Sequence, residues 1–196
     1  MSDAQPLQAI HDALGQRSVV LVGLMGCGKS AIGRRLAGKL SLPFVDADEE
    51  IEKAAGKSIE EIFADHGEPY FRDGERKVLA RLLRSGPQVL ATGGGTFMNA
   101  ESRAAIADSG VSVWLKADLP LLVRRVGRRG NRPLLKAGDP ETVLRNLIAT
   151  RYPIYAEADI TVESRDVPHE VIVNEIIGRL SSALAPPSEV SREVRR

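Results

Sequence analysis

Short apolar runs alternate with longer amphipathic segments along most of the chain. Residues 18–22 (SVVLV) form a β-branched run that ends at a glycine, which is typical of a strand buried on both faces. In residues 30–40 the apolar side chains recur at helical spacing. The same alternation continues, with strands expected at 44–45, 89–91, 111–115 and 160–162, and helices at 49–55, 58–84, 100–107, 119–126, 141–155 and 168–184. Strands alternating with helices predict an α/β fold, with a parallel sheet of five strands covered by helices on both faces.

The length of 196 residues fits one domain, which we place at 18–184. Residues 1–17 form an N-terminal extension, expected as a mobile tail or a short accessory helix, and 185–196 a flexible C-terminal tail. Residues 127–140 (GRRGNRPLLKAGDP) break the alternation, being rich in Gly, Pro and Arg. A loop of this length inside a compact domain is usually functional, which suggests a mobile lid.

Composition narrows the class of protein. A net charge of +1, with 27% charged and 43% hydrophobic residues, argues against a nucleic-acid partner. The single cysteine, Cys27, allows no intrachain disulfide and fits a reducing compartment. The first 17 residues show no long apolar run, so we expect neither a secretion signal nor a membrane span, and a cytoplasmic protein.

The strongest functional signal is the loop at residues 23–30, GLMGCGKS, which fits G-x-x-x-x-G-K-S between an expected strand and helix. In such a loop backbone N–H groups and the helix N-terminus converge on phosphate oxygens. Lys29 should reach the β and γ phosphates and Ser30 should ligate Mg²⁺. The alternative is a glycine-rich turn with an incidental Lys-Ser, and for Cys27 small size explains its presence better than redox chemistry.

Further polar groups follow the next expected strands. Asp46 and Asp48 come after the second strand, where carboxyl ends of parallel strands face a ligand crevice. One carboxylate can serve Mg²⁺ and the other an acceptor hydroxyl, although Asp48 could instead cap the next helix. Residues 93–95, three glycines, allow close approach of the backbone to a ligand, or form a plain tight turn. Arg72 and Arg151 lie in expected helices beside aromatic residues, and either alone is more often a surface ion pair.

Taken together, these motifs resemble the shikimate kinases over roughly residues 18–180. The resemblance rests on the phosphate loop, Asp46-Ala47-Asp48, SIEEIF at 58–63 continuing to GEPYFR at 67–72, the three glycines, RPLL at 132–135 and RYPIY at 151–155. This family implies a P-loop kinase of the nucleoside-monophosphate-kinase type with strand order 2-3-1-4-5. It also implies a monomer that transfers the γ-phosphoryl group of ATP to the 3-hydroxyl of shikimate, in the route to chorismate and the aromatic amino acids.

The resemblance also assigns roles to residues. Lys29, Asp48 and Arg132 would be catalytic, with Asp48 contacting the acceptor hydroxyl and Arg132 acting from the lid. Ser30 and Asp46 would hold one Mg²⁺. The nucleotide would contact Gly26, Cys27, Gly28, Lys29, Ser30, Ala31, Arg125, Arg132 and Arg165. Shikimate would contact Asp48, Arg72, Gly94 and Arg151, with Phe63 and Phe71 as an apolar wall and Glu75 orienting an arginine.

These roles agree with elementary chemistry. Paired arginines match a carboxylate, and phosphoryl transfer needs mainly positioning and charge neutralisation. One departure is Ala31, where many members have Thr. Two alternatives stay open: another small-molecule kinase of this type, for gluconate or a nucleotide, and a regulatory module that kept the fold without catalysis.

Overall fold

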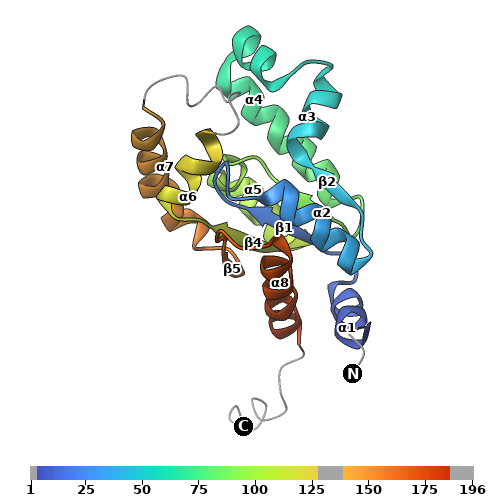
Figure 1. The fold of residues 1–196 in the computed structure, drawn as a ribbon. Helices are drawn as coiled ribbons and strands as arrows, with labels where there is room; N and C mark the ends of the chain where they lie inside the picture. The colour runs from blue at the N-terminus through green and yellow to red at the C-terminus, as the bar shows by residue number, and fades with distance from the viewer. Residues whose placement is uncertain (1–3, 128–138, 186–196) are drawn as a thin grey trace, which may run out of the picture.

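The computed structural model describes residues 4–127 and 139–185, with the side chains of residues 4–6 left out (Figure 1). Its centre is one parallel sheet in the order β2-β3-β1-β4-β5. The expected five-stranded sheet and its order are therefore confirmed. The strands are β1 (Ser18–Val22), β2 (Phe44–Asp46), β3 (Val89–Ala91), β4 (Gly110–Lys116) and β5 (Ile160–Glu163).

The central strands form the core because their residues are apolar on both faces. Every residue of β1 and β3 is buried, and in β4 only Lys116 is exposed. Val20 of β1 lies level with Leu90 of β3 on one side and Ser112 of β4 on the other. Such continuous apolar runs are what a sheet covered on both faces requires.

Helices cover the two faces, α2 and α8 on one and α5 with part of α4 on the other (Figure 1). Because β1, β2 and β3 are paired in parallel, their carboxyl ends lie at the same edge of the sheet. The helices of the described chain are α1 (Ala4–Leu14), α2 (Lys29–Leu40), α3 (Ala47–Ala55), α4 (Ile59–Leu83), α5 (Ala100–Ser109), α6 (Leu119–Gly127), α7 (Pro140–Tyr155) and α8 (His169–Leu184), with a 3₁₀ turn η1 at Thr96–Met98.

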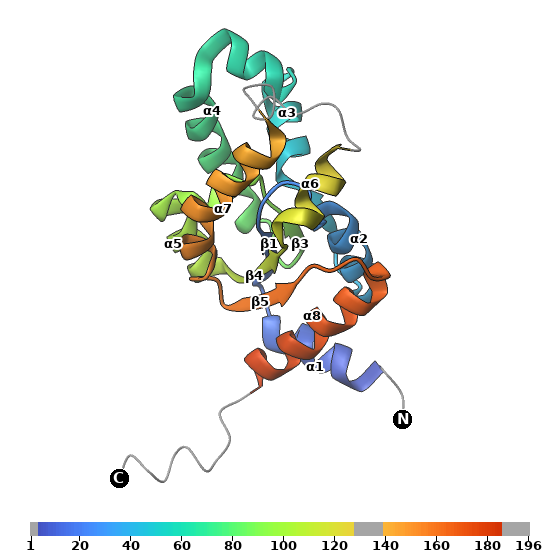
Figure 2. The same cartoon turned by 60° about the vertical axis from the view of Figure 1, so that its left-hand side comes forward.

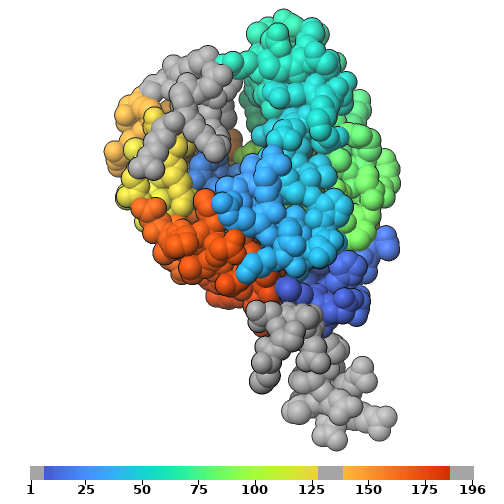
Figure 3. Space-filling view, turned by 45° about the vertical axis from the view of Figure 1, so that its right-hand side comes forward, coloured from blue at the N-terminus to red at the C-terminus, as the bar shows by residue number. Residues whose placement is uncertain are grey.

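Helix α4 is not the single regular helix that the sequence pattern predicts. It starts with a capping box, in which Ser58 and Glu61 satisfy each other's backbone N–H groups. Gly67 then takes φ 79° and ψ 177°, outside the helical region, and Pro69 follows two residues later. Glycine readily adopts this left-handed φ, and proline is tolerated in the first turn of a helix. With α3, this broken helix projects beyond the sheet as one end of the molecule (Figure 3).

The N-terminal extension forms helix α1, so of the two expectations the accessory helix is confirmed. Ile10 and Leu14 are buried, and α1 packs against α8 and α2 (Figure 2). Helix α1 precedes β1, whereas the phosphate loop at residues 23–30 follows β1. Helix α1 therefore lies at the end of the sheet away from the phosphate loop. Most of the expected lid and of the C-terminal tail falls outside the described residues. No helix within the described part is long and apolar enough to cross a membrane.

Candidate active site

The loop after β1 has the strand-to-helix geometry that the motif predicts. Gly23 adopts φ 137°, and a Cβ there would lie 2.8 Å from the Leu115 carbonyl oxygen, so only glycine fits. Gly28, with φ 102°, precedes the first residue of α2. The Nζ of Lys29 donates to the carbonyl oxygens of Gly23 at 2.7 Å and Leu24 at 3.0 Å. The lysine ammonium is thus held against the concave side of the loop.

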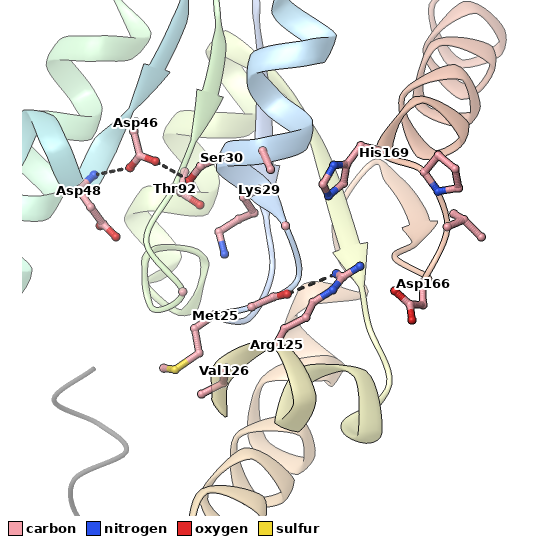
Figure 4. A pocket seen from close by; sticks show the side chains of 16 residues that line it. Met25, Lys29, Ser30, Asp46, Asp48, Thr92, Arg125, Val126, Asp166 and His169 are labelled. Carbon is pink, nitrogen blue, oxygen red and sulfur yellow. Dashed lines mark hydrogen bonds between the residues drawn. The ribbon is translucent and has the colours of Figure 1, made fainter. Parts of the chain in front are cut away.

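A cavity of about 560 Å³ opens at this loop (Figure 4). Of the expected nucleotide contacts in the described chain, six line the cavity: Gly26, Gly28, Lys29, Ser30, Ala31 and Arg125. Asp46, Asp48 and Gly94 line it as well. Cys27 does not, because it is fully buried beneath the loop, as expected for a small packing residue. The cavity therefore joins the phosphate loop to the ends of β2 and β3.

Asp46 links the second strand to the phosphate loop. Its Oδ2 accepts from the Ser30 hydroxyl at 2.7 Å, and its Oδ1 accepts from the Asp48 backbone N–H at 3.1 Å (Figure 4). The second bond makes Asp46 the N-cap residue of α3. The alternative that Asp48 caps this helix is wrong, because the capping residue is the one before the helix, and Asp48 is inside its first turn.

These oxygens suit a magnesium ion. Mg²⁺ is usually held by one or two carboxylates and by substrate phosphates, keeping several waters. Ser30 donates its proton to Asp46, so the lone pairs of its oxygen remain available to a cation. No cluster of three or more His, Cys, Asp or Glu side chains suited to a metal occurs in the described residues. A site completed by phosphates does not require one.

Arg72 is held by acidic partners on its own helix. Its guanidinium donates to Glu75 at 2.8 Å and to Glu68 at 2.9 Å. Glu75 is buried and also accepts from the Thr96 hydroxyl at 2.6 Å. Burial works against the charge of Arg72, but Glu75 and Glu68 outweigh it and raise the arginine's pKa above its ordinary value. The expected orienting contact of Glu75 with an arginine is therefore present.

The break in α4 brings Phe63 and Phe71 together. Their ring centroids lie 4.7 Å apart, and the Arg72 guanidinium carbon lies 5.1 Å from the Phe71 centroid. The two rings come from opposite sides of Gly67, so the break places them side by side. An apolar wall thus adjoins the first arginine.

Arg151 is held by the glycine loop after β3. Its Nη1 donates to the Gly94 carbonyl oxygen at 2.8 Å. The Tyr155 hydroxyl donates to the same oxygen, and Tyr155 is fully buried. Burial raises the pKa of the Tyr155 phenol, although Arg151 opposes the shift. Arg151 and Tyr155 are four residues apart on α7 and share one face of that helix.

Arg125 and Arg165 differ in their placement. Arg125 reaches the loop, donating to Ser164 Oγ at 2.9 Å and lying 3.4 Å from the carbonyl oxygens of Gly26 and Cys27. Arg165 pairs with Glu175 at 2.7 Å and lines a neighbouring cavity of about 370 Å³ instead. An adenine contact of Arg165 gains no support from this placement. Arg132 lies outside the described residues.

Sequence reasoning missed one wall of the cavity. The segment Asp166, Val167, Pro168 and His169 lines it, between β5 and α8 (Figure 4). Burial, Arg35 and Arg125 lower the pKa of His169. The signal was available, since this segment follows the carboxyl end of the last parallel strand, where ligand crevices lie. Met25, Thr92 and Val126 complete the lining.

A phosphate loop on a parallel sheet, joined by one cavity to two aspartates, defines a P-loop kinase of small molecules. A model of the shikimate kinase family matches residues 25–181. The chain belongs to the shikimate kinase family. A relative of that name from Bradyrhizobium diazoefficiens is 56% identical over 207 aligned positions, covering 100% of both chains. One from Caulobacter vibrioides is 58% identical, covering 93% of this chain and 88% of its own.

The similarity to solved structures supports the same family. A shikimate kinase from Acinetobacter baumannii in complex with shikimate has a TM-score of 0.83 at 37% identity, covering 88% of this chain and 97% of its own. A gluconokinase from Sinorhizobium meliloti, at TM-score 0.53 and 18% identity, shares the fold alone. The chain is thus an ATP-dependent phosphotransferase that moves the γ-phosphoryl group of ATP to the 3-hydroxyl of shikimate, giving shikimate 3-phosphate and ADP.

Proposed function

We propose that the glycine loop after β3, residues 93–95, forms the floor of the shikimate site, and that three shikimate-binding side chains lie around this loop. One observation supports this above the others: each of the three glycines adjoins a different expected group. A Cβ on Gly93 would lie 2.8 Å from Asp48 Oδ1, one on Gly95 2.5 Å from Arg72 Nη1, and one on Gly94 3.6 Å from Arg151 Nη1. Two guanidinium groups and the carboxylates of Asp48 and Glu75 thus surround a stretch without side chains.

In this arrangement Arg72 and Arg151 bind the shikimate carboxylate. Guanidinium groups pair with carboxylates through parallel, charge-assisted hydrogen bonds, which fix orientation as well as position. Phe63 and Phe71 contact the apolar face of the ring next to Arg72. Asp48 accepts a hydrogen bond from the 3-hydroxyl at the opposite end of the molecule. The Gly94 backbone supplies a further polar contact.

The nucleotide occupies the other half of the cavity. The backbone N–H groups of residues 26–31 and the N-terminus of α2 receive the phosphates. Arg125 contacts the adenine from α6, next to the wall that includes Val167 and Pro168. Ser30 and Asp46 hold one Mg²⁺, which neutralises phosphate charge when bound.

Phosphoryl transfer then requires little covalent chemistry from the protein. The 3-hydroxyl oxygen forms a bond to the γ-phosphorus as the bond between that phosphorus and the β,γ-bridging oxygen breaks, and ADP leaves. Asp48 takes the hydroxyl proton. Lys29 and Arg132, the latter from the lid, stabilise negative charge that develops on the transferring group.

ADP release measured with a series of acceptors tests the carboxylate clamp. We expect turnover with shikimate, a KM at least about tenfold higher with shikimate methyl ester, whose carboxyl group carries no charge, and no acceleration of basal ATP hydrolysis by gluconate. The ester is a matched probe because the ring and its hydroxyls are unchanged. Equal KM values for acid and ester would contradict the clamp, and turnover of gluconate would favour the other kinase class.

We also propose that the chain acts as a monomer. In the described residues the large apolar side chains with high exposure are Tyr70 and Val171, too few for an extensive apolar interface. Light scattering after size exclusion should give the 21.2 kDa mass of one chain. A concentration-independent dimer mass would refute this.

A further inference from the structure

The Gly94 carbonyl oxygen receives two hydrogen bonds from helix α7. Arg151 donates from Nη1 and Tyr155 from its phenol, and the two donors lie one helical turn apart. A carbonyl oxygen has two lone pairs and can accept both. This single oxygen therefore ties α7 to the glycine loop at the point where the proposed shikimate site is built.

Tyr155 is set rigidly. It is 0% exposed and packs against Phe97 and Trp114, with ring centroids 6.3 Å and 5.9 Å away. Phe97 belongs to η1, which directly follows the glycine loop. The tyrosine ring is thus fixed by η1, which follows the loop, and by β4, and its hydroxyl can define where the Gly94 oxygen lies.

Arg151, in contrast, is only partly buried and has a long, flexible side chain. A guanidinium group has five N–H donors. One donor given to the Gly94 oxygen fixes the rotation of the group and leaves the others for a carboxylate. If that oxygen moved, Arg151 would keep its charge but would lose the hydrogen bond that fixes the orientation of its guanidinium.

We propose that Tyr155 is a positioning residue for shikimate binding: its hydroxyl holds the Gly94 carbonyl oxygen, and that oxygen orients the Arg151 guanidinium. The inference rests on the proposed role of Arg151 in binding the shikimate carboxylate. Tyr155 itself does not touch the substrate. Because burial raises the pKa of its phenol, Tyr155 keeps the donated proton throughout the neutral pH range.

The chain supplies a matched control in Tyr152. Tyr152 also lies on α7 and also donates its hydroxyl to a backbone carbonyl, that of Ala117. Its ring packs against Trp114 at 4.9 Å, but it lines the neighbouring cavity and not the active one. Tyr152→Phe and Tyr155→Phe therefore remove the same chemical group from the same helix, and only the second reaches Gly94.

The test is steady-state kinetics on the full chain, with thermal melting of each variant. Tyr155→Phe should raise the KM for shikimate about threefold to tenfold, the loss expected for one hydrogen bond, and leave kcat and the KM for ATP within about twofold. Tyr152→Phe should lower the melting temperature comparably and leave the shikimate KM unchanged. A merely structural role for Tyr155 would make the two variants alike in all four quantities, which would overturn the proposal.

A double-mutant cycle locates the effect. In an Arg151→Ala background, adding Tyr155→Phe should change the shikimate KM by less than about twofold, because the residue it positions is already gone. An undiminished effect in that background would mean that Tyr155 acts independently of Arg151, and the proposal would be wrong. A raised KM for Arg151→Ala with a normal KM for Tyr155→Phe would reject this inference alone. A normal KM for Arg151→Ala would reject the clamp itself.

Discussion

Gly95→Ala offers a test of the shikimate site that removes no functional group. The backbone of Gly95 has φ −100° and ψ −15°, which alanine adopts without strain. A Cβ there, however, would lie 2.5 Å from Arg72 Nη1 and 2.6 Å from both Cζ and Nη2. The three atoms nearest to the methyl group therefore all belong to the Arg72 guanidinium.

The size of the displacement follows from these distances. Ordinary van der Waals contact starts near 3.4 Å, so Arg72 must retreat by about 0.9 Å. Misplacement of about 1 Å can cost on the order of a hundredfold in an active site, and one charge-assisted hydrogen bond is worth about 1.5–3 kcal/mol. We expect the shikimate KM to rise at least about tenfold. The ATP KM should not change, since Arg72 does not line the nucleotide cavity.

The assay is ADP release at saturating ATP with varied shikimate, together with a thermal melt. Gly74→Ala is the matched control, because a Cβ there meets nothing within 4 Å although Gly74 lies in the same helix as Arg72. That variant should keep wild-type kinetics and gain up to about 1 kcal/mol of stability. A folded Gly95→Ala variant with a wild-type shikimate KM would refute the placement of Arg72 in the site.

Four further variants test other parts of the molecule. Lys29→Met should lower kcat about a hundredfold or more with little change in melting temperature, and near-normal turnover would contradict the phosphate-loop role. Arg132→Ala, outside the described residues, should lower kcat strongly with less effect on shikimate KM; equal effects on both would argue against a transition-state role. Thr96→Val removes a 2.6 Å hydrogen bond to buried Glu75 and should cost about 1–3 kcal/mol of unfolding free energy and raise the shikimate KM, as denaturant melts and kinetics would show. Burial raises the pKa of Tyr152 from 10.0 to about 12, so the native state keeps a proton that the unfolded chain loses. Stability should therefore fall between pH 10 and pH 12, and less steeply in Tyr152→Phe; identical slopes would contradict the shift.

The sheet was predictable because its signal is local. Each strand contains a short apolar run, and the phosphate loop is a continuous motif of eight residues, 23–30. The break in α4 was harder to foresee, since Gly67 and Pro69 interrupt a pattern whose apolar spacing continues on both sides. Gly67 and Pro69 permit the break, and the contact that it allows between Phe63 and Phe71 joins residues too far apart for a regular helix to bring together.

Individual site residues were predictable to different degrees. Lys29 and Ser30 follow from one motif, whereas the partners of Arg151 do not, because Gly94 lies 57 residues away and is tied to it through a backbone oxygen. A backbone carbonyl cannot be recognised from the sequence, so nothing there connects Tyr155 with Gly94. For Arg165 the sequence shows only a basic residue after the last strand, and it does not show that this arginine pairs with Glu175 on α8.

Asp46 shows that an aspartate after β2 can cap the next helix and also contact the phosphate loop. A carboxylate has two oxygens, and here Oδ1 serves the backbone of α3 while Oδ2 serves the Ser30 hydroxyl. The bond from Asp48 N–H starts α3 at a defined residue, and that start sets where the Asp48 side chain leaves the backbone. The bond from Ser30 ties the same carboxylate to α2. One side chain thus fixes the distance between the phosphate loop and the proposed acceptor base, Asp48. The same hydrogen bonds that begin α3 therefore also hold the nucleotide side and the acceptor side of the active site in position.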